Sequence, residues 1–342
     1  MLKKKAELVK KGNKPKTVRN ALTTYIGKEL NSRQEEVPLI SEYLKYAYCE
    51  PLHLKNNVTK EMFMKVVKVI IESKEASVPK DIKSFSELAT ENLFHYFIMY
   101  LRHEMNCNYL SKKLIAWFNA NLLANKITEF GFRFRGKESF NFLRYFPKLI
   151  NSLIQLIKNT QAVSRLIQVF YQSLQLRVLV SYSVRIVDIN QEGINVMKKA
   201  GLCLFRSCCL YDSSVSPSLW TFSNAAPAHA QFLFTTYGVG LGINTMEGRE
   251  QKHQQIEKYS KKATYQERWK FVFRHEFIQV IYLRENGFDT NNYRKRNSKY
   301  IPEREEGHCI CSLKLVNENC PICDSEGMKK VLDALKKIER KN

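Results

Sequence analysis

The sequence predicts a mainly α-helical protein with a small cysteine-rich unit near its C-terminus. Between residue 58 and about residue 200, apolar residues recur with the period of amphipathic helices, without the strict alternation that is typical of strands. Four cysteines follow in two close pairs. Lysine and arginine outnumber aspartate and glutamate by 55 to 33, which gives a formal net charge of +22. These observations predict a helical bundle, a metal-binding loop and a partner of opposite charge.

The N-terminal residues predict a basic arm. Residues 1–20 contain eight Lys or Arg and one Glu, and Gly12 and Pro15 interrupt them. We assign residues 1–37 to this arm, which could lie on phosphates or act as an import signal. Its candidate nucleic-acid contacts are Lys3, Lys4, Lys5, Lys10 and Lys11.

A short extended segment is expected next. In YLKYAYCEPLHLKNN, aromatic and small apolar residues lead to Pro51, and a proline cannot donate to a central ladder. We therefore predict a strand over residues 46–49 that ends at Glu50. An amphipathic helix is expected to follow, with Thr59 as its N-cap.

The helical block is expected over residues 58–215. Its further helices are predicted over 85–107, 110–126, 140–158 and 160–185, with Gly131, Gly136 and Pro147 as breaks. In the segment FGFRFR, phenylalanines are interleaved with Arg133 and Arg135. This pattern fits base stacking and phosphate contacts, and it fits a connecting loop with two surface arginines equally well.

Three helical segments are expected after this block. They cover 225–238, 246–259 with Thr245 as the N-cap, and 264–286. The glycines between the first two follow a helix, and no Lys-Ser/Thr comes after them, so they predict a turn with positive φ and not a phosphate loop. The sequence contains no run of 18 apolar residues and no signal peptide, so no membrane association is expected.

The region 291–342 predicts a zinc knuckle and a basic C-terminal helix. Cys309-x-Cys311 and Cys320-Pro-Ile-Cys323 are separated by eight residues, a spacing at which four thiolates could surround one structural Zn²⁺. His308 is an alternative ligand, and four buried or free cysteines are the alternative interpretation. Before the knuckle, Arg294, Lys295 and Arg296 are candidates for phosphate contacts or for a nuclear signal.

The remaining cysteines and the tryptophans are expected to be structural. No ligand spacing links the other five cysteines, so we expect buried thiols at Cys49, Cys107, Cys203, Cys208 and Cys209. The tryptophans are expected to be core or interface anchors at Trp117, Trp220 and Trp269. Nine cysteines without a secretory signal indicate a reducing, intracellular compartment.

An acidic helix face is expected in the segment that begins NTMEGREQKH. On a helix, Glu247, Glu250 and His253 fall at spacings of three residues and share one face. A solvated face with Glu–Lys pairs is the simplest interpretation. Composition alone does not distinguish it from carboxylates that bind a metal.

Two segments resemble landmarks of DDE-type transposases with an RNase H-like core, of the broad group that includes hAT and Mutator-like elements. They are CEPLHLKNN at 49–57 and PAHAQFLFTTYGVGLGINTMEGREQKH at 227–253. In those families a core strand carries a Cys or Asp, two further residues and then a His, followed by basic and Asn positions. Glu50-Pro-Leu-His53, then Lys55 and Asn56, is similar to that pattern. A large helical insertion comes next in those families, and a later helix carries the last catalytic carboxylate. The resemblance implies that Glu250 is the last catalytic carboxylate, with Glu247 as the alternative. It also implies catalytic roles for Glu50 and His53.

The resemblance also implies a domain organisation. It makes 38–57 a strand of a partial RNase H-like α/β core, 58–215 an all-helical insertion, and 216–290 the C-terminal helices of the core. In such enzymes carboxylates hold two Mg²⁺ or Mn²⁺ ions, which activate the nucleophile and stabilise the leaving oxygen during DNA cleavage and strand transfer.

The sequence departs from this family at its first two carboxylates. These are usually aspartates on early strands, and no Asp precedes Asp81. We therefore expect the C-terminal part of a transposase, as a fragment or a domesticated remnant, that binds DNA in the nucleus and is catalytically inactive alone. A homodimer or the parent transposase is its expected protein partner. The alternatives are a non-enzymatic nucleic-acid-binding zinc module and a helical scaffold for protein partners.

Overall fold

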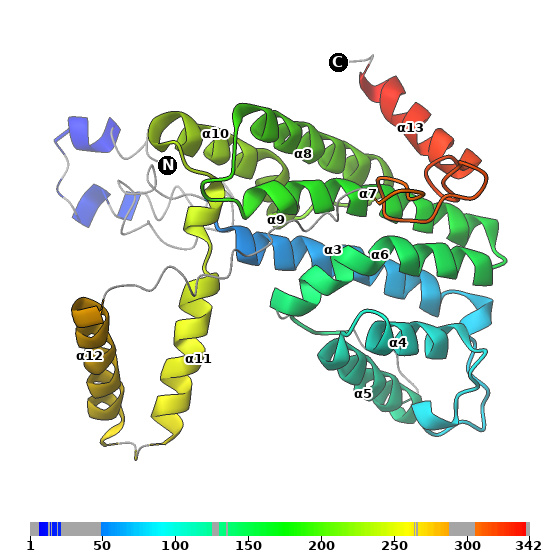
Figure 1. The fold of residues 1–342 in the computed structure, drawn as a ribbon, viewed down its shortest axis with the longest axis horizontal. Coiled ribbons are helices and arrows are strands. Elements are labelled where there is room, and N and C mark those ends of the chain that lie inside the picture. Colours follow the sequence, from blue (N-terminus) through cyan, green and yellow to red (C-terminus); the bar gives the residue numbers. More distant parts are fainter. Residues whose placement is uncertain are drawn as a thin grey trace. The chain divides into compact units, whose positions relative to one another are not determined.

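The computed structural model describes residues 7–12, 14, 16–18, 20–21, 49–124, 130–134, 136–262, 264, 266–286 and 305–339. The chain divides into two compact units, Met1–Tyr48 and Cys49–Asn342. In the first unit residues 7–10 are helical, and Lys11 Nζ lies 2.9 Å from a Glu7 carboxylate oxygen. The second unit is mainly helical (Figure 1), and in its described part β structure occurs only as two isolated bridges in the cysteine loop. Among the helices so described, none has the length and apolarity that a membrane span requires.

The second unit begins with helix α3, Pro51–Ile71, so the strand predicted for 38–57 is wrong at residues 51–57. Residues 38–48 lie outside the described part of the chain. Pro51 occupies the first helical position, where its missing N–H is not needed and its fixed φ suits the helix. The same proline that argued for a strand end therefore marks a helix start. Thr59, predicted as the N-cap, is buried within α3.

The helices predicted for the central block are confirmed. They are α4 (Leu93–His103), α5 (Asn108–Ala124), α6 (Gly136–Leu156) and α7 (Thr160–Ser183). Helix α8 (Gln191–Tyr211) belongs to the same block and was not predicted. An asparagine side chain caps α4, α7 and α8, as helix starts favour. Pro147, expected to be a break, lies inside α6. Its neighbours Phe146 and Leu149 are fully buried, and their burial offsets the cost of an interior proline.

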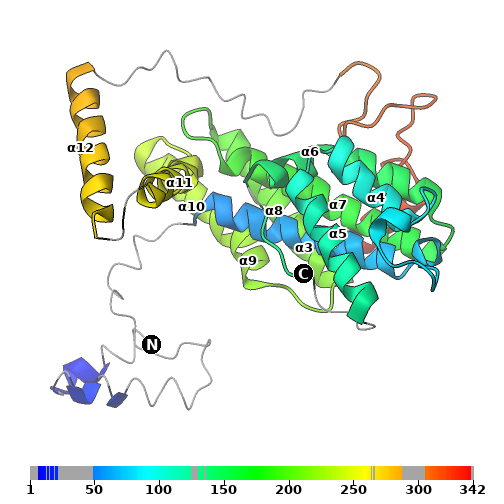
Figure 2. The same ribbon diagram turned by 90° about the horizontal axis from the view of Figure 1, so that it is seen from below.

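Helix α7 is the centre of the second unit, and α3, α6 and α8 pack on it. Figures 1 and 2 show these helices side by side. Several α7 side chains have no exposed surface, among them Leu166, Phe170, Leu176, Leu179 and Val180.

A second part of the core is aromatic and surrounds Phe63 of α3. The rings of Phe132, Phe134 and Phe142 lie 5.1 to 5.8 Å from the Phe63 ring, centroid to centroid. Phe130, Phe132 and Phe134 are 5 to 7% exposed. The base-stacking interpretation of this segment is therefore wrong, because these rings face the protein interior. Arg133 between them is exposed, as expected for a connecting loop.

The chain continues beyond residue 215 in contact with the same bundle. Helix α9 (Pro217–Trp220), a five-residue π-helix (Thr221–Ala225) and α10 (Ala226–Tyr237) form one continuous helical segment. The π-helix packs on α8, where a Cβ at Gly201 would collide with the Ser223 carbonyl oxygen. The segments on the two sides of residue 215 thus pack against each other.

The glycine-rich turn after α10 serves two different purposes. Gly238 ends α10 with φ +68°, as predicted for a left-handed helix end. Gly240 and Gly242 have no positive φ. A Cβ on either would collide with the backbone carbonyl of Arg185 or Val184, so these glycines allow the turn to lie against the end of α7.

Three more helices complete the described chain. Helices α11 (Glu247–Lys261) and α12 (Arg268–Asn286) pack on each other as a hairpin, shown in yellow and orange in Figure 1. The N-cap position of α11 is Met246 and not Thr245. After the cysteine loop, α13 (Glu326–Glu339) packs on α7 and α8.

Candidate functional site

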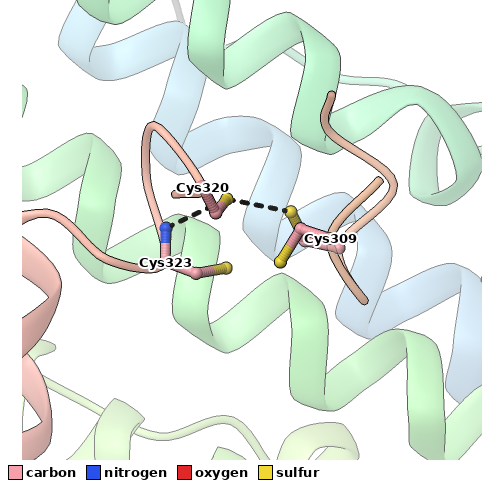
Figure 3. A group of neighbouring side chains, drawn as sticks. Cys309, Cys320 and Cys323 are labelled. Atoms are coloured by element: carbon pink, nitrogen blue, oxygen red, sulfur yellow. Dashed lines mark hydrogen bonds between the residues drawn. The ribbon is translucent and has the colours of Figure 1, made fainter. Parts of the chain in front are cut away.

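Four cysteine side chains converge in the loop before α13, as the sequence predicted. Their sulfur atoms all lie within 4.8 Å of one another, and the Cys311 and Cys320 sulfurs are 3.6 Å apart. Figure 3 shows Cys309, Cys320 and Cys323 pointing toward one centre. A tetrahedral site with Zn–S bonds of about 2.3 Å needs sulfurs about 3.8 Å apart, so the group could hold one metal ion such as zinc.

Two tight turns bring the cysteine pairs together. In the first, the Cys309 N–H donates to the Leu313 carbonyl at 2.8 Å, and Ser312 has φ +74°. In the second, the Cys323 N–H donates to the Cys320 sulfur at 3.3 Å, and the Cys320 N–H donates to Asp324 at 2.6 Å. N–H donors to sulfur are typical of loops that hold thiolates.

The electrostatics of the cysteine group favour a cation. A hydrogen bond from the Cys323 thiol lowers the pKa of Cys311 to about 6, and the same contact raises the pKa of Cys323. Burial raises the pKa of Cys320 to about 11. One thiolate thus forms easily and suppresses the ionisation of its neighbours, whereas a divalent cation would allow all four to ionise. Four protein ligands leave no open position, so the arrangement suits a structural metal.

His308 is not part of this group. Its Nδ1 lies 3.1 Å from the Glu306 carbonyl oxygen, and the described cluster of metal-ligating side chains comprises the four cysteines. Of the other cysteines, Cys49, Cys107 and Cys208 are buried as predicted. The prediction is wrong for Cys203, which is half-buried, and for Cys209, which is exposed.

Arg177 of α7 attaches the cysteine loop to the helical core, and no sequence pattern predicted this contact. Its side chain is 3% exposed, and its guanidinium donates to the Cys311 carbonyl at 3.1 Å and to the Ser312 hydroxyl at 3.4 Å. Burial lowers the pKa of Arg177 to about 10, so the group stays charged at neutral pH. The loop therefore rests on a buried, charge-assisted contact.

The two segments that carried the resemblance meet at the start of α3. The Cys49 N–H donates to His229 Nδ1 at 2.9 Å, and the Met246 N–H donates to Glu50 Oε1 at 2.8 Å. These contacts join residues separated by 180 and 196 positions. Burial lowers the pKa of His229, which suits a neutral ring whose Nδ1 accepts a hydrogen bond.

Glu50 uses both carboxylate oxygens in hydrogen bonds. Oε1 accepts from the N–H groups of Leu52 and Met246, and Oε2 accepts from the N–H of His53 and lies 2.6 Å from His53 Nδ1. Partial burial pushes the pKa of Glu50 upward, but these hydrogen bonds outweigh it and hold the pKa below its usual value. Glu50 is thus an ionised helix cap and a tie to the start of α11.

The remaining candidate residues are distributed as follows. Helix α11 begins at Glu247 and includes Glu250. The side chains of both residues lie outside the described part of the structure. Lys10, Lys11 and Arg133 are exposed. The other candidate nucleic-acid contacts lie outside the described residues: Lys3, Lys4, Lys5, Arg135, Arg294, Lys295 and Arg296.

Comparison with known proteins identifies no relative: no family model, no curated protein and no solved structure matches this chain.

Proposed function

We propose that this chain is a transposon-derived, nuclear, DNA-binding protein whose metal-dependent cleavage site is incomplete. The observation that carries the proposal is its charge, 55 basic against 33 acidic residues. An excess of this size attracts a polyanion, and binding is driven by the release of counterions from the phosphates. The exposure of Lys10, Lys11 and Arg133 supports their assignment as phosphate contacts.

The meeting of the two motif segments supports the transposase ancestry. A cleavage site of this kind needs carboxylates from distant parts of the chain at one place. The Glu50–Met246 hydrogen bond brings the first motif to the residue that precedes α11, the helix that carries Glu247 and Glu250. The partial RNase H-like core remains part of this proposal.

The hydrogen bonding of Glu50 supports the incompleteness of the site. A carboxylate whose two oxygens already accept four hydrogen bonds would have to give up its helix cap to bind Mg²⁺ or Mn²⁺. The chain also has no aspartate before Asp81. The expected activity of the chain alone is therefore DNA binding without cleavage.

Salt-dependent binding tests this function. Fluorescence anisotropy of the zinc-loaded full chain with labelled duplex should show affinity that falls steeply between about 50 and 200 mM salt. Alanine at Lys3, Lys4, Lys5, Lys10 and Lys11 should weaken binding and flatten the salt slope by up to about 4 or 5, because each lost duplex phosphate contact removes about 0.9. The matched control carries alanine at five exposed lysines of the helical block: Lys74, Lys80, Lys83, Lys112 and Lys113.

Incubation of the same DNA with Mg²⁺ or Mn²⁺ tests the second part of the proposal. Intact DNA is expected on a gel. If the wild-type chain nicks the DNA and Glu250→Gln does not, the cleavage site is complete, and the proposal that it is incomplete is wrong. Absence of binding to any nucleic acid at low salt would overturn DNA binding itself and leave the helical scaffold for protein partners.

A further inference from the structure

Helix α12 exposes a row of aromatic side chains. Trp269, Phe273 and Phe277 are 63, 66 and 67% exposed, although side chains of this size are usually buried. They recur every four residues, so they lie in one row along the helix. The opposite side of α12 packs on α11, where the His275 ring stacks 4.3 Å from the Tyr259 ring and the Phe271 ring lies 6.4 Å from it, centroid to centroid. The aromatic row therefore faces away from the hairpin partner.

Basic side chains follow this row. Lys270 and Arg274 are exposed, and each comes one residue after an aromatic of the row. Lys270 Nζ lies 3.3 Å from Glu267 Oε1, and both side chains are more than half exposed. An ion pair so exposed contributes little to stability, so phosphate could replace the glutamate at small cost. We call Trp269, Phe273 and Phe277 with Lys270 and Arg274 the α12 aromatic face.

The charge of the chain argues against a second copy on this face. Two molecules of net charge +22 repel each other, and the α12 aromatic face adds two further basic side chains at the contact. A partner with aromatic rings of its own and a negative backbone complements both features. Single-stranded nucleic acid is such a partner, because its unpaired bases are free to stack on aromatic side chains.

We infer that the α12 aromatic face binds single-stranded nucleic acid by base stacking on Trp269, Phe273 and Phe277, with Lys270 and Arg274 on the phosphates. The Trp269 and Phe273 rings lie 5.9 Å apart, centroid to centroid, and 33° from parallel, so the two rings contact each other. Bases would therefore stack on the exposed surfaces of the rings and not between them. This inference rests on the proposed function and adds the class of nucleic acid that α12 selects.

The test compares oligothymidine, a duplex and an abasic oligonucleotide of equal charge, each bound to the zinc-loaded full chain. Phe273→Ala should weaken oligothymidine binding about tenfold or more, leave duplex binding within about twofold, and leave binding to the abasic strand unchanged. Phe273→Leu keeps the apolar volume and should also weaken oligothymidine binding, since it lacks a ring. The matched control is Phe232→Ala, which removes a 47% exposed ring from α10 and should have no effect on any of the three.

Tryptophan fluorescence gives an independent readout. Oligothymidine should quench the emission of the chain, and Trp269→Phe should abolish the quenching, because the other two tryptophans, Trp117 and Trp220, lie on other helices. Equal affinity of Phe273→Ala and wild type for oligothymidine would overturn the inference and leave the proposed DNA binding intact. Self-association that Phe273→Ala abolishes and Phe273→Leu preserves would assign the face to a second copy. Failure to bind any of the three probes would overturn both.

Discussion

Glu50 holds together the start of α3 and the start of α11 with one carboxylate. Glu50→Ala removes the helix cap and the acceptor for the Met246 N–H, so the free energy of unfolding should fall by about 1–2 kcal/mol. Urea unfolding at neutral pH measures this change. The control is Glu104→Gln, at an exposed position, which should alter stability by less than about 0.5 kcal/mol.

The contribution of Glu50 to the free energy of unfolding should fall as the pH is lowered. Its pKa is lower in the folded than in the unfolded chain, so the carboxylate stabilises the fold fully above the unfolded pKa of about 4.3. The stabilisation disappears as pH falls through the folded pKa, when both states bind the proton. The stability difference between wild type and Glu50→Gln should therefore shrink between pH 5 and the acid limit in a urea series. A difference that grows on acidification would contradict this assignment.

Arg177 is the second residue with a long-range effect. Arg177→Met keeps much of the buried volume but leaves the Cys311 carbonyl without its charged donor, which should cost about 1–3 kcal/mol. We expect faster loss of zinc to a chelator, measured with a chromogenic zinc indicator, at unchanged helix content. Arg165→Met, which breaks the exposed ion pair with Glu72 at 3.0 Å, is the control and should leave the rate unchanged.

At the scale of elements, the helices of the central block were predictable because their apolar period reports a buried face directly. The start of α3 was not predictable, because a Glu-Pro pair can end a strand or begin a helix. Which of the two forms depends on whether the glutamate carboxylate accepts hydrogen bonds from the N–H groups that follow it, as Glu50 does. The helix break predicted at Pro147 is wrong for a related reason, since the burial of its neighbours in α6 outweighs the hydrogen bond that the proline cannot donate. The exposure of Trp269 was equally hidden, because sequence spacing shows that a row exists and not whether anything covers it.

The segment around Phe132 gives a prediction at this scale. Phe132 is 7% exposed and stacks 4.9 Å from Phe130, so Phe132→Ala should lower the free energy of unfolding by about 3–5 kcal/mol. The DNA affinity of the molecules that remain folded should not change, because the ring cannot reach a base. Thermal unfolding and anisotropy on the same samples separate the two effects. Arg133→Ala should show the reverse pattern, with unchanged stability and weaker DNA binding.

At the scale of the whole molecule, the spacing of the four cysteines predicted their cluster, whereas its attachment to α7 could not be predicted. The Arg177–Cys311 contact joins residues 134 positions apart, and the Glu50–Met246 contact joins residues 196 apart. Local patterns carry no information on such pairs, which depend on how the helices pack. The resemblance implied a catalytic role for Glu50, which stays a prediction, and the structure adds that this carboxylate caps α3 and accepts from the Met246 N–H.

Zinc removal tests how far the cysteine loop supports the rest of the fold. The core around α7 is apolar and large, so chelation should leave α3 to α8 folded, while residues 305–325 and α13 lose protection against hydrogen exchange. Binding of one zinc per chain is expected in the untreated protein, and Cys320→Ser should reproduce the effect of the chelator. The exchange pattern decides the role of the loop. If protection is lost only there, the metal stabilises a peripheral unit whose loss leaves the α12 aromatic face unchanged. If protection is lost throughout α7 as well, the buried Arg177 transmits the loss of metal into the core, and zinc supports the whole second unit.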